Sequence, residues 1–200
     1  MSVVIHEVSH GAMASRLGDP TARLAGRLTL NPMAHLDPVG SFFVPLAVYL
    51  ATAGTTTFGW AKPVPVNPYN LKAGKWGPAL VSVVGPGANL LIATIFSIIV
   101  RVGYVYFSVE VIEMMATIVI INIVLGVFNL LPIPPLDGSK IASAFFPREY
   151  SKFEGLVSRY YLVFFAFILI VGWQIVQVPI LWLATHFLGS DVLSVLIMGV

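Results

Sequence analysis

Long apolar runs restrict what this chain can fold into more than any other feature. Residues 78–100 carry no charged side chain, and residues 111–131 carry only Glu113. Each run is as long as the roughly 20 residues that a helix needs to cross a bilayer. Further apolar stretches lie at residues 38–54, 159–178 and 180–198. The sequence therefore predicts an all-α polytopic membrane protein, a helical bundle of about five to six membrane segments with short extended or β segments in its cytoplasmic loops.

The composition excludes several other classes of protein. Only 10% of the residues are charged and 58% are hydrophobic, whereas about a quarter of a soluble domain is charged. The net charge of +2 is too small to indicate a nucleic-acid partner, so the lipid bilayer is the expected surrounding. There is no cysteine, which excludes disulfides, cysteine catalysis and thiolate metal sites. Any metal must be bound through His, Asp or Glu.

Several segments depart from a simple spanning helix. Residues 1–17 predict a helix of about 25 Å, which is short for a membrane span. Residues 38–54 contain Pro45 and favour a re-entrant segment over a full crossing. Residues 27–30 alternate between polar and apolar side chains and predict a short strand. Gly85-Pro86-Gly87 is expected to interrupt the helix at residues 78–100, and Pro179 is expected to separate the last two apolar segments.

The basic residues predict the orientation in the membrane. Of the eleven Lys and Arg residues, only Arg101 lies outside three connections, which are residues 16–37, 55–76 and 132–159. Because basic loops stay in the cytoplasm, all three connections should face that side. Both flanks of residues 38–54 are then on the same side, which again favours a re-entrant segment.

The first predicted helix carries the pattern H-E-x-x-H at His6-Glu7-Val8-Ser9-His10. Residues four apart share one helix face, so both imidazoles can reach one tetrahedral Zn²⁺ at about 2.0–2.1 Å. Glu7 lies beside them, where it can act as general base for a water that the metal activates. A chance pattern is the alternative. Two histidines and a glutamate in an apolar helix are costly in lipid, however, unless they are paired or functional.

A catalytic zinc takes three protein ligands, so a third must be found. The candidates are Asp137, His35, His186, Asp37, Glu110 and Glu113. Asp137 is favoured because prolines at 132, 134 and 135 end the preceding apolar run and can turn the chain back toward the core. The predicted topology places Asp137 at a depth near that of His6 and His10. An ordinary Asp-Gly turn is the alternative for this residue.

Together these motifs resemble the site-2 protease family of intramembrane zinc metalloproteases, in its compact prokaryotic form. The matching stretches are His6–Gly11, Gly18–Arg23, Asn31-Pro32 with His35, Asp37–Gly40, Phe58–Pro65, Gly85–Asn89 and Asn129–Gly138. We therefore expect residues 1–146 to form a metalloprotease membrane core and residues 147–200 to add C-terminal membrane helices. Family members carry a longer apolar run before the first histidine. Either the first helix begins upstream of Met1, or neighbouring helices hold its short start.

The resemblance implies hydrolysis of peptide bonds in transmembrane or membrane-associated substrates. One zinc would be held by His6, His10 and Asp137, with Glu7 as the base. It also implies an integral protein of a prokaryotic cell membrane, with the active site toward the cytoplasmic side. Asn89 matches a membrane asparagine of the family that is implicated in substrate binding. An interhelical hydrogen bond is the alternative for it.

A second hypothesis is a zinc-binding membrane protein without enzyme activity, either a transporter or an inactive scaffold. A transporter is expected to carry ionisable residues along several helices, whereas here they cluster at His6, Glu7, His10 and Asp137. Glu7 also need not be a ligand, which argues against an inactive scaffold. For the protease, the proline-rich residues 55–76 could offer an extended edge to an unwound substrate.

Overall fold

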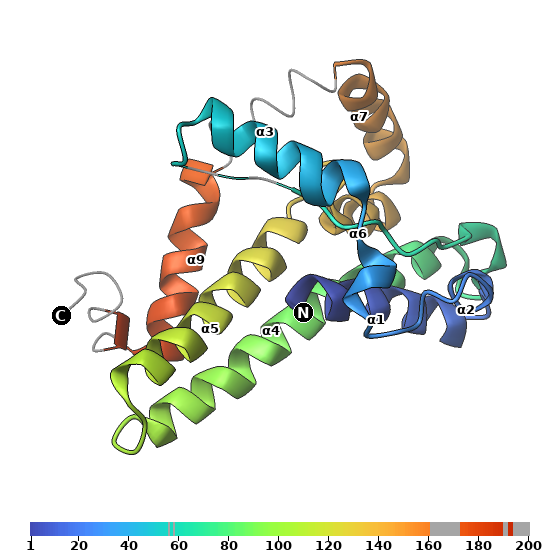
Figure 1. Ribbon diagram of the computed structural model, residues 1–200. Coiled ribbons are helices and arrows are strands. Elements are labelled where there is room, and N and C mark those ends of the chain that lie inside the picture. The colour runs from blue at the N-terminus through green and yellow to red at the C-terminus, as the bar shows by residue number, and fades with distance from the viewer. Residues whose placement is uncertain (56, 58, 161–172, 190–191, 194–200) are drawn as a thin grey trace.

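Helices of very different length make up the chain (Figure 1). The computed structural model describes residues 1–55, 57, 59–160, 173–189 and 192–193. The helical elements in chain order are α1 Ser2–Arg16, α2 Thr21–Leu24, η1 Pro32–His35, η2 Val39–Phe43, α3 Val44–Ala51, η3 Pro68–Asn70, η4 Gly74–Trp76, α4 Gly77–Gly103, α5 Val109–Asn129, α6 Asp137–Phe145, α7 Pro147–Arg159 and α9 Trp173–Leu188.

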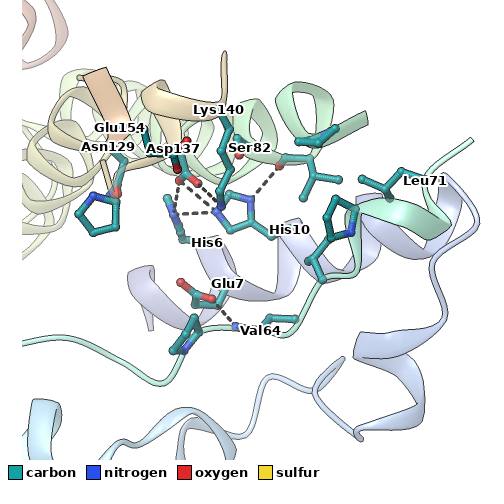
Figure 2. Close-up of a pocket in the computed structure, with 16 residues that line it drawn as sticks. His6, Glu7, His10, Val64, Leu71, Ser82, Asn129, Asp137, Lys140 and Glu154 are labelled. Atoms are coloured by element: carbon teal, nitrogen blue, oxygen red, sulfur yellow. Dashed lines mark hydrogen bonds and ion pairs between the residues drawn. The ribbon is translucent and has the colours of Figure 1, made fainter. Parts of the chain in front are cut away.

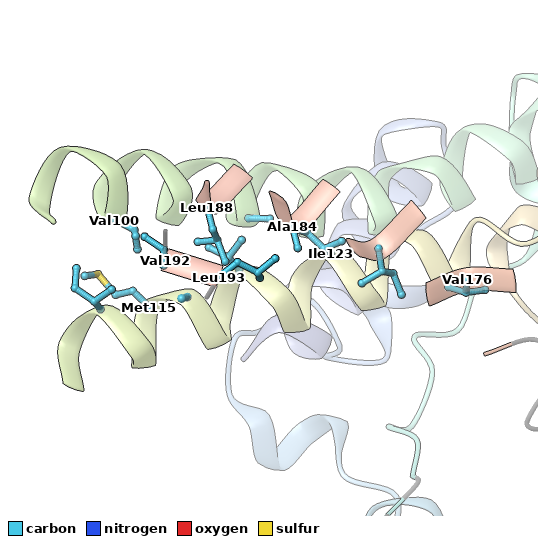
Figure 3. Packing of buried hydrophobic residues seen from close by; sticks show 13 residues of the cluster. Val100, Met115, Ile123, Val176, Ala184, Leu188, Val192 and Leu193 are labelled. Atoms are coloured by element: carbon cyan, nitrogen blue, oxygen red, sulfur yellow. The ribbon is translucent and has the colours of Figure 1, made fainter. Parts of the chain in front are cut away.

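The long helices α4 and α5 lie side by side and run in opposite directions, and α9 packs against both (Figure 1). Their shared core is built from small and branched apolar side chains, among them Ala93, Val119, Ile123 and Ala184 (Figure 3). Helices α1 and α6 pack on α4 as well. The α4–α5 pair is therefore the scaffold on which α1 and α6 are brought together.

Two prolines lie inside helices, which corrects the expected breaks. Helix α4 continues through Pro86, and α9 continues through Pro179. A proline costs a helix one backbone hydrogen bond and a steric clash, but neighbouring helices can support such a turn in a membrane bundle. Pro86 is fully buried, and α9 packs on α4 and α5. The expected interruption at Pro86 and the expected boundary at Pro179 are therefore both wrong.

Helices α4 and α5 meet the requirements for membrane spans. Residues Gly74–Gly103 and Val109–Asn129 are long and apolar enough to cross a bilayer, and their apolar windows are only 33% and 39% buried. Large apolar side chains on their outer faces are open to the surroundings, such as Leu91 at 60% and Val102 at 71% exposure. Such a surface is unusual on a soluble monomer and is expected where lipid covers it.

The predicted first helix and the predicted re-entrant segment are both short helices. Helix α1 begins at Ser2, and its start is held by neighbours, because Asn122 Nδ2 donates to Ser2 Oγ at 2.9 Å. Residues Val39–Ala51 form one continuous apolar helical stretch of η2 and α3. At 1.5 Å per residue this stretch is about 20 Å long, shorter than the roughly 30 Å hydrocarbon core.

The expected strand at residues 27–30 does not form, and the described part of the chain contains no strand at all. Local hydrogen bonds take the place of a ladder. The backbone oxygen of Thr29 accepts from His35 Nε2, and Asn31 Oδ1 caps η1 by accepting from Met33 N. Side chains that bond nearby backbone compete with sheet formation in this way.

The C-terminal expectations are only partly within the described residues. Most of the predicted segment 159–178 and the end of 180–198 lie outside them. In the described part, Arg101 at the end of α4 donates Nε to the Phe187 oxygen at 2.6 Å and Nη2 to the His186 oxygen. These carbonyls lie at the C-terminal end of α9, where a cation is favourable. The division at residues 146 and 147 stays a prediction.

Candidate metal centre

Three side chains from two distant segments of the sequence meet between α1 and the start of α6 (Figure 2). His6 and His10 lie one turn apart on α1, and Asp137 is the first residue of α6. Asp137 Oδ2 lies 3.1 Å from Nε2 of each histidine, and the two Nε2 atoms are 3.0 Å apart. All three residues are buried. The structure thus brings together the three residues that the sequence predicts as metal ligands.

The hydrogen bonds of the imidazoles determine which nitrogen carries the proton. His6 Nδ1 lies 2.6 Å from Asn89 Oδ1, and His10 Nδ1 lies 2.8 Å from the backbone oxygen of Val81. Asn89 is oriented by its Nδ2, which faces the backbone oxygen of Ser2, a group that only accepts. Both Nδ1 atoms are therefore donors, and in the neutral imidazoles both Nε2 atoms present a lone pair. This is the tautomer that binds a metal through Nε2.

The donor set fits a zinc ion. Two imidazole nitrogens and a carboxylate oxygen converge within 3.1 Å. With both imidazoles neutral, their lone pairs and the carboxylate point at one place, an arrangement that a cation stabilises. In a tetrahedral site with bonds of about 2.0–2.1 Å, neighbouring ligand atoms are about 3.3 Å apart. The observed separations are close to that value. Two His and one carboxylate also leave the fourth position open, as in catalytic zinc sites.

Two glycines make this convergence possible. A Cβ added to Gly85 on α4 would lie 2.4 Å from His10 Cε1 and 2.8 Å from His6 Cε1. A Cβ added to Gly138 would lie 2.1 Å from the backbone oxygen of Leu130. Gly85 therefore lets α4 approach the imidazole rings, and Gly138 lets the start of α6 pack on the turn after α5. The second contact places Asp137 over the histidines.

Glu7 lies beside the three ligands but is held by a different segment. Its Oε2 accepts the backbone N–H of Val64 at 2.8 Å, and Figure 2 shows it directed toward Val64, away from Asp137. Val64 stands between Pro63 and Pro65, which have no N–H and fixed φ angles. The single donor of this Pro-Val-Pro sequence is thus used to orient Glu7.

Asp19 fastens the segment that carries Val64. It is fully buried after α1 and accepts hydrogen bonds from the Thr21 hydroxyl, the Asn67 backbone N–H at 2.7 Å and Asn70 Nδ2 at 3.0 Å. Burial alone would raise the pKa of Asp19, but these hydrogen bonds to the charged form outweigh it and lower the pKa. The Asp19 carboxylate therefore ties the proline-rich segment to the end of α1.

Two cavities adjoin the metal residues. One has a volume of about 650 Å³ and the other about 530 Å³. His6, Glu7 and Asn129 belong to the walls of both. Both volumes are in the range of ligand-binding cavities. A peptide placed against Glu7 would therefore lie next to both cavities.

The other candidate ligands lie elsewhere and have other partners. His35 Nε2 faces a backbone oxygen at 2.9 Å, and Asp37 Oδ1 accepts backbone N–H groups at the start of η2. His186 Nδ1 bonds the Trp182 oxygen within α9. The last two candidates, at the start of α5, are Glu110 and Glu113. Within the described ranges, the group formed by His6, His10 and Asp137 is the one suited to a metal.

Asn89 lies behind the metal ligands. It is fully buried, accepts from His6 Nδ1 and donates Nδ2 to Asn122 Oδ1 at 2.8 Å. It is not among the residues that line the two cavities. These contacts are those of the interhelical alternative, and they join α4, α5 and α1 at the metal ligand. A direct contact with substrate stays a prediction.

Sequence reasoning missed the residues that act through the backbone. Gly85, the Val64 N–H and the Val81 carbonyl each orient or admit a site residue. Two of them lie within visible motifs, Gly85-Pro86-Gly87 and the Pro-Val-Pro sequence. Neither motif predicts which distant side chain will contact its backbone.

Comparison with known proteins agrees with this geometry. A family model described as peptidase family M50 matches residues 99–171, which include Asp137. The chain is 38% identical over 154 residues to "Putative zinc metalloprotease YwhC" of Bacillus subtilis, an alignment that covers 74% of this chain and 66% of that protein. The chain belongs to peptidase family M50. The resemblance to the site-2 protease family is thereby confirmed.

Other relatives are mycobacterial. The chain is 32% identical over 138 residues to "Putative zinc metalloprotease Rip2" of Mycolicibacterium smegmatis and 30% identical to the protein of the same name in Mycobacterium tuberculosis. Each alignment covers 69% of this chain and 51% of the relative. The chain thus spans about half to two thirds of the length of these curated relatives. No solved structure matches the chain.

Proposed function

We propose that this M50 protein is an intramembrane zinc metalloprotease that cleaves transmembrane or membrane-associated substrates. The observation that carries the proposal is the convergence of His6 Nε2, His10 Nε2 and Asp137 Oδ2, with Glu7 next to them on α1. This set has three ligands, an open position and a separate base, the combination that metal-dependent hydrolysis requires. Glu7 is absent from the ligand group, which favours a catalytic role for it over a purely structural zinc site.

The residues divide the chemistry among them. A zinc ion held by His6, His10 and Asp137 would supply a Lewis acid that polarises the scissile carbonyl and acidifies the attacking water. Asn89 and the Val81 carbonyl keep both imidazoles in the ligating tautomer. Because Glu7 Oε2 accepts the Val64 N–H, we assign the base to Oε1. Glu7 takes the proton of the water and then gives it to the leaving amine nitrogen.

Helices α4 and α5 support a position for this chemistry below the membrane surface. Gly85 lies eight residues into α4, so the ligands would be about 12 Å from the start of that helix. Lys62, Lys72 and Lys140 belong to the basic connections of the sequence, which favours the cytoplasmic side for this end of α4. The short helical stretch Val39–Ala51 would dip into the membrane without crossing it. Water would then reach Glu7 from the cytoplasm.

The proline-rich segment has fewer free backbone N–H groups for pairing with a substrate than an ordinary strand edge has. The backbone N–H groups of Lys62, Val64 and Asn67 already donate within the chain, to His35, Glu7 and Asp19. Pro63 and Pro65 have no N–H. A substrate strand lying along residues 62–65 would therefore pair through the carbonyl oxygens of this stretch. We propose orientation of Glu7 as the main task of the segment.

The test is cleavage of a co-expressed single-span membrane protein by wild type and by Glu7→Gln. Glutamine keeps the size and a hydrogen-bonding oxygen for Val64 but cannot take a proton from water. We expect Glu7→Gln to retain its metal and to lose cleavage. Full cleavage by Glu7→Gln would exclude the proposed mechanism.

A further inference from the structure

The two cavities beside Glu7 differ in the ionisable side chains that line them. Both cavities have apolar wall residues, but the ionisable side chains of His10, Asp137, Lys140 and Glu154 line only the larger one. The smaller cavity, which we call the Trp60 cavity, has a mainly apolar wall. Its apolar members include Val3, Leu36, Trp60, Leu125, Phe128 and Leu136. An apolar side chain in the larger cavity would take water away from charged groups without pairing them, which is unfavourable.

The wall of the Trp60 cavity is held in place by backbone contacts. The Trp60 N–H donates to the Gly40 oxygen at 3.0 Å, and the Trp60 oxygen accepts from Ser41 Oγ at 2.9 Å. A Cβ added to Gly40 would lie 2.2 Å from Trp60 Nε1, so the indole ring rests directly on the backbone of η2. The cavity is therefore already formed before any ligand enters, as is usual for ligand sites.

The Trp60 cavity reaches the reacting groups, because His6 and Glu7 belong to its wall. If the scissile carbonyl of a peptide lies at these residues, the side chain next to the cleaved bond lies at one of the two cavities. We propose that the Trp60 cavity binds this side chain and selects a large apolar one, such as Leu, Phe or Trp. The inference rests on the proposed function and adds the substrate class to it.

The size of the effect follows from known pocket selectivity. One methylene more or less in an apolar pocket changes selectivity by about 10-fold to 200-fold. Leu125 and Phe128, one turn apart on α5, are the wall residues that can be changed most simply, because each is only partly buried. A larger residue at Leu125 should fill the cavity, and a smaller one at Phe128 should enlarge it.

The experiment uses peptide hydroxamates, which bind the metal directly and need no cleavage. Three compounds differ only in the side chain next to the hydroxamate, which is Ala, Leu or naphthylalanine. Their dissociation constants are measured on the zinc-loaded, detergent-solubilised protein. We expect the Leu and naphthylalanine compounds to bind the wild type about tenfold or more tightly than the Ala compound.

Variants of α5 assign the selectivity to the cavity. Leu125→Trp should abolish the naphthylalanine advantage and leave the Ala compound within about twofold of its wild-type affinity. Phe128→Ala should weaken the Leu compound more than the naphthylalanine compound. Met114 lies on the same helix and is 60% exposed, so Met114→Trp should leave the affinities of all three compounds unchanged.

The outcomes separate the two claims. Equal affinity of all three compounds for wild type would overturn the inference and leave the proposed function intact. The inference is also overturned if Leu125→Trp and Phe128→Ala both keep the wild-type ranking. If no hydroxamate binds the zinc-loaded protein, the proposed function is contradicted and the inference falls with it.

Discussion

We expect Gly85→Ala to weaken metal binding sharply, although it adds a single methyl group. The added Cβ would lie 2.4 Å from His10 Cε1 and 2.8 Å from His6 Cε1, whereas ordinary contact begins at 3.4 Å. Both rings would have to withdraw by about 0.6 to 1 Å, several times the roughly 0.2 Å tolerance of a metal–ligand distance. Displacing supported ligands typically costs about 10-fold to 100-fold in metal affinity. We expect a loss of at least that size.

The assay is competition with a chelator of known affinity, followed by the zinc content of the purified protein. Gly87→Ala is the matched control, because a Cβ at Gly87 would meet nothing within 4 Å. Both changes lie on α4 and alter the intrinsic helix propensity equally, by about 1 kcal/mol in favour of alanine. The difference between the two variants therefore reports the contact with the histidines alone. Wild-type zinc affinity in Gly85→Ala would refute the close approach of α4 to the ligands.

Two further changes probe the supports of the site. Asn89→Leu removes the acceptor of the His6 Nδ1 proton, so zinc affinity in the same competition assay should fall about 10-fold to 100-fold; an unchanged affinity would contradict the assigned tautomer. Asp19→Asn should lower the thermal unfolding temperature at pH 7, measured in detergent. Because the pKa of Asp19 is lowered from 3.8, its stabilisation is present above that pH and is lost as the pH falls through the lowered pKa. The difference in unfolding temperature between wild type and Asp19→Asn should shrink only below pH 3.8. A temperature difference that already disappears near neutral pH would count against the role of Asp19.

Local features of the fold can be predicted from the sequence. The helices α1, α4 and α5 follow from apolar runs and from residues that end them. His6 and His10 share a helix face because their spacing alone requires it. The position of Asp137 after a proline-rich turn, together with the family motif, predicts it as their partner, and the structure places it 3.1 Å from both.

Tertiary contacts explain what the sequence does not reveal. Pro86 and Pro179 predict helix breaks, yet packing between helices keeps α4 and α9 continuous. The alternation at residues 27–30 predicts a strand. Instead, His35 Nε2 bonds the Thr29 oxygen, and Asn31 Oδ1 accepts from the Met33 N–H. The contact of the Val64 N–H with Glu7 joins residues 57 positions apart, and no local pattern encodes it.

The zinc content of purified protein tests the central claim most directly. Wild type and Glu7→Gln should each hold about one tightly bound zinc per chain, because Glu7 lies outside the ligand group. Asp137→Ala should lose most of it, because the remaining two imidazoles leave the site one ligand short. Retention of wild-type zinc affinity by Asp137→Ala would contradict the assigned centre of His6, His10 and Asp137.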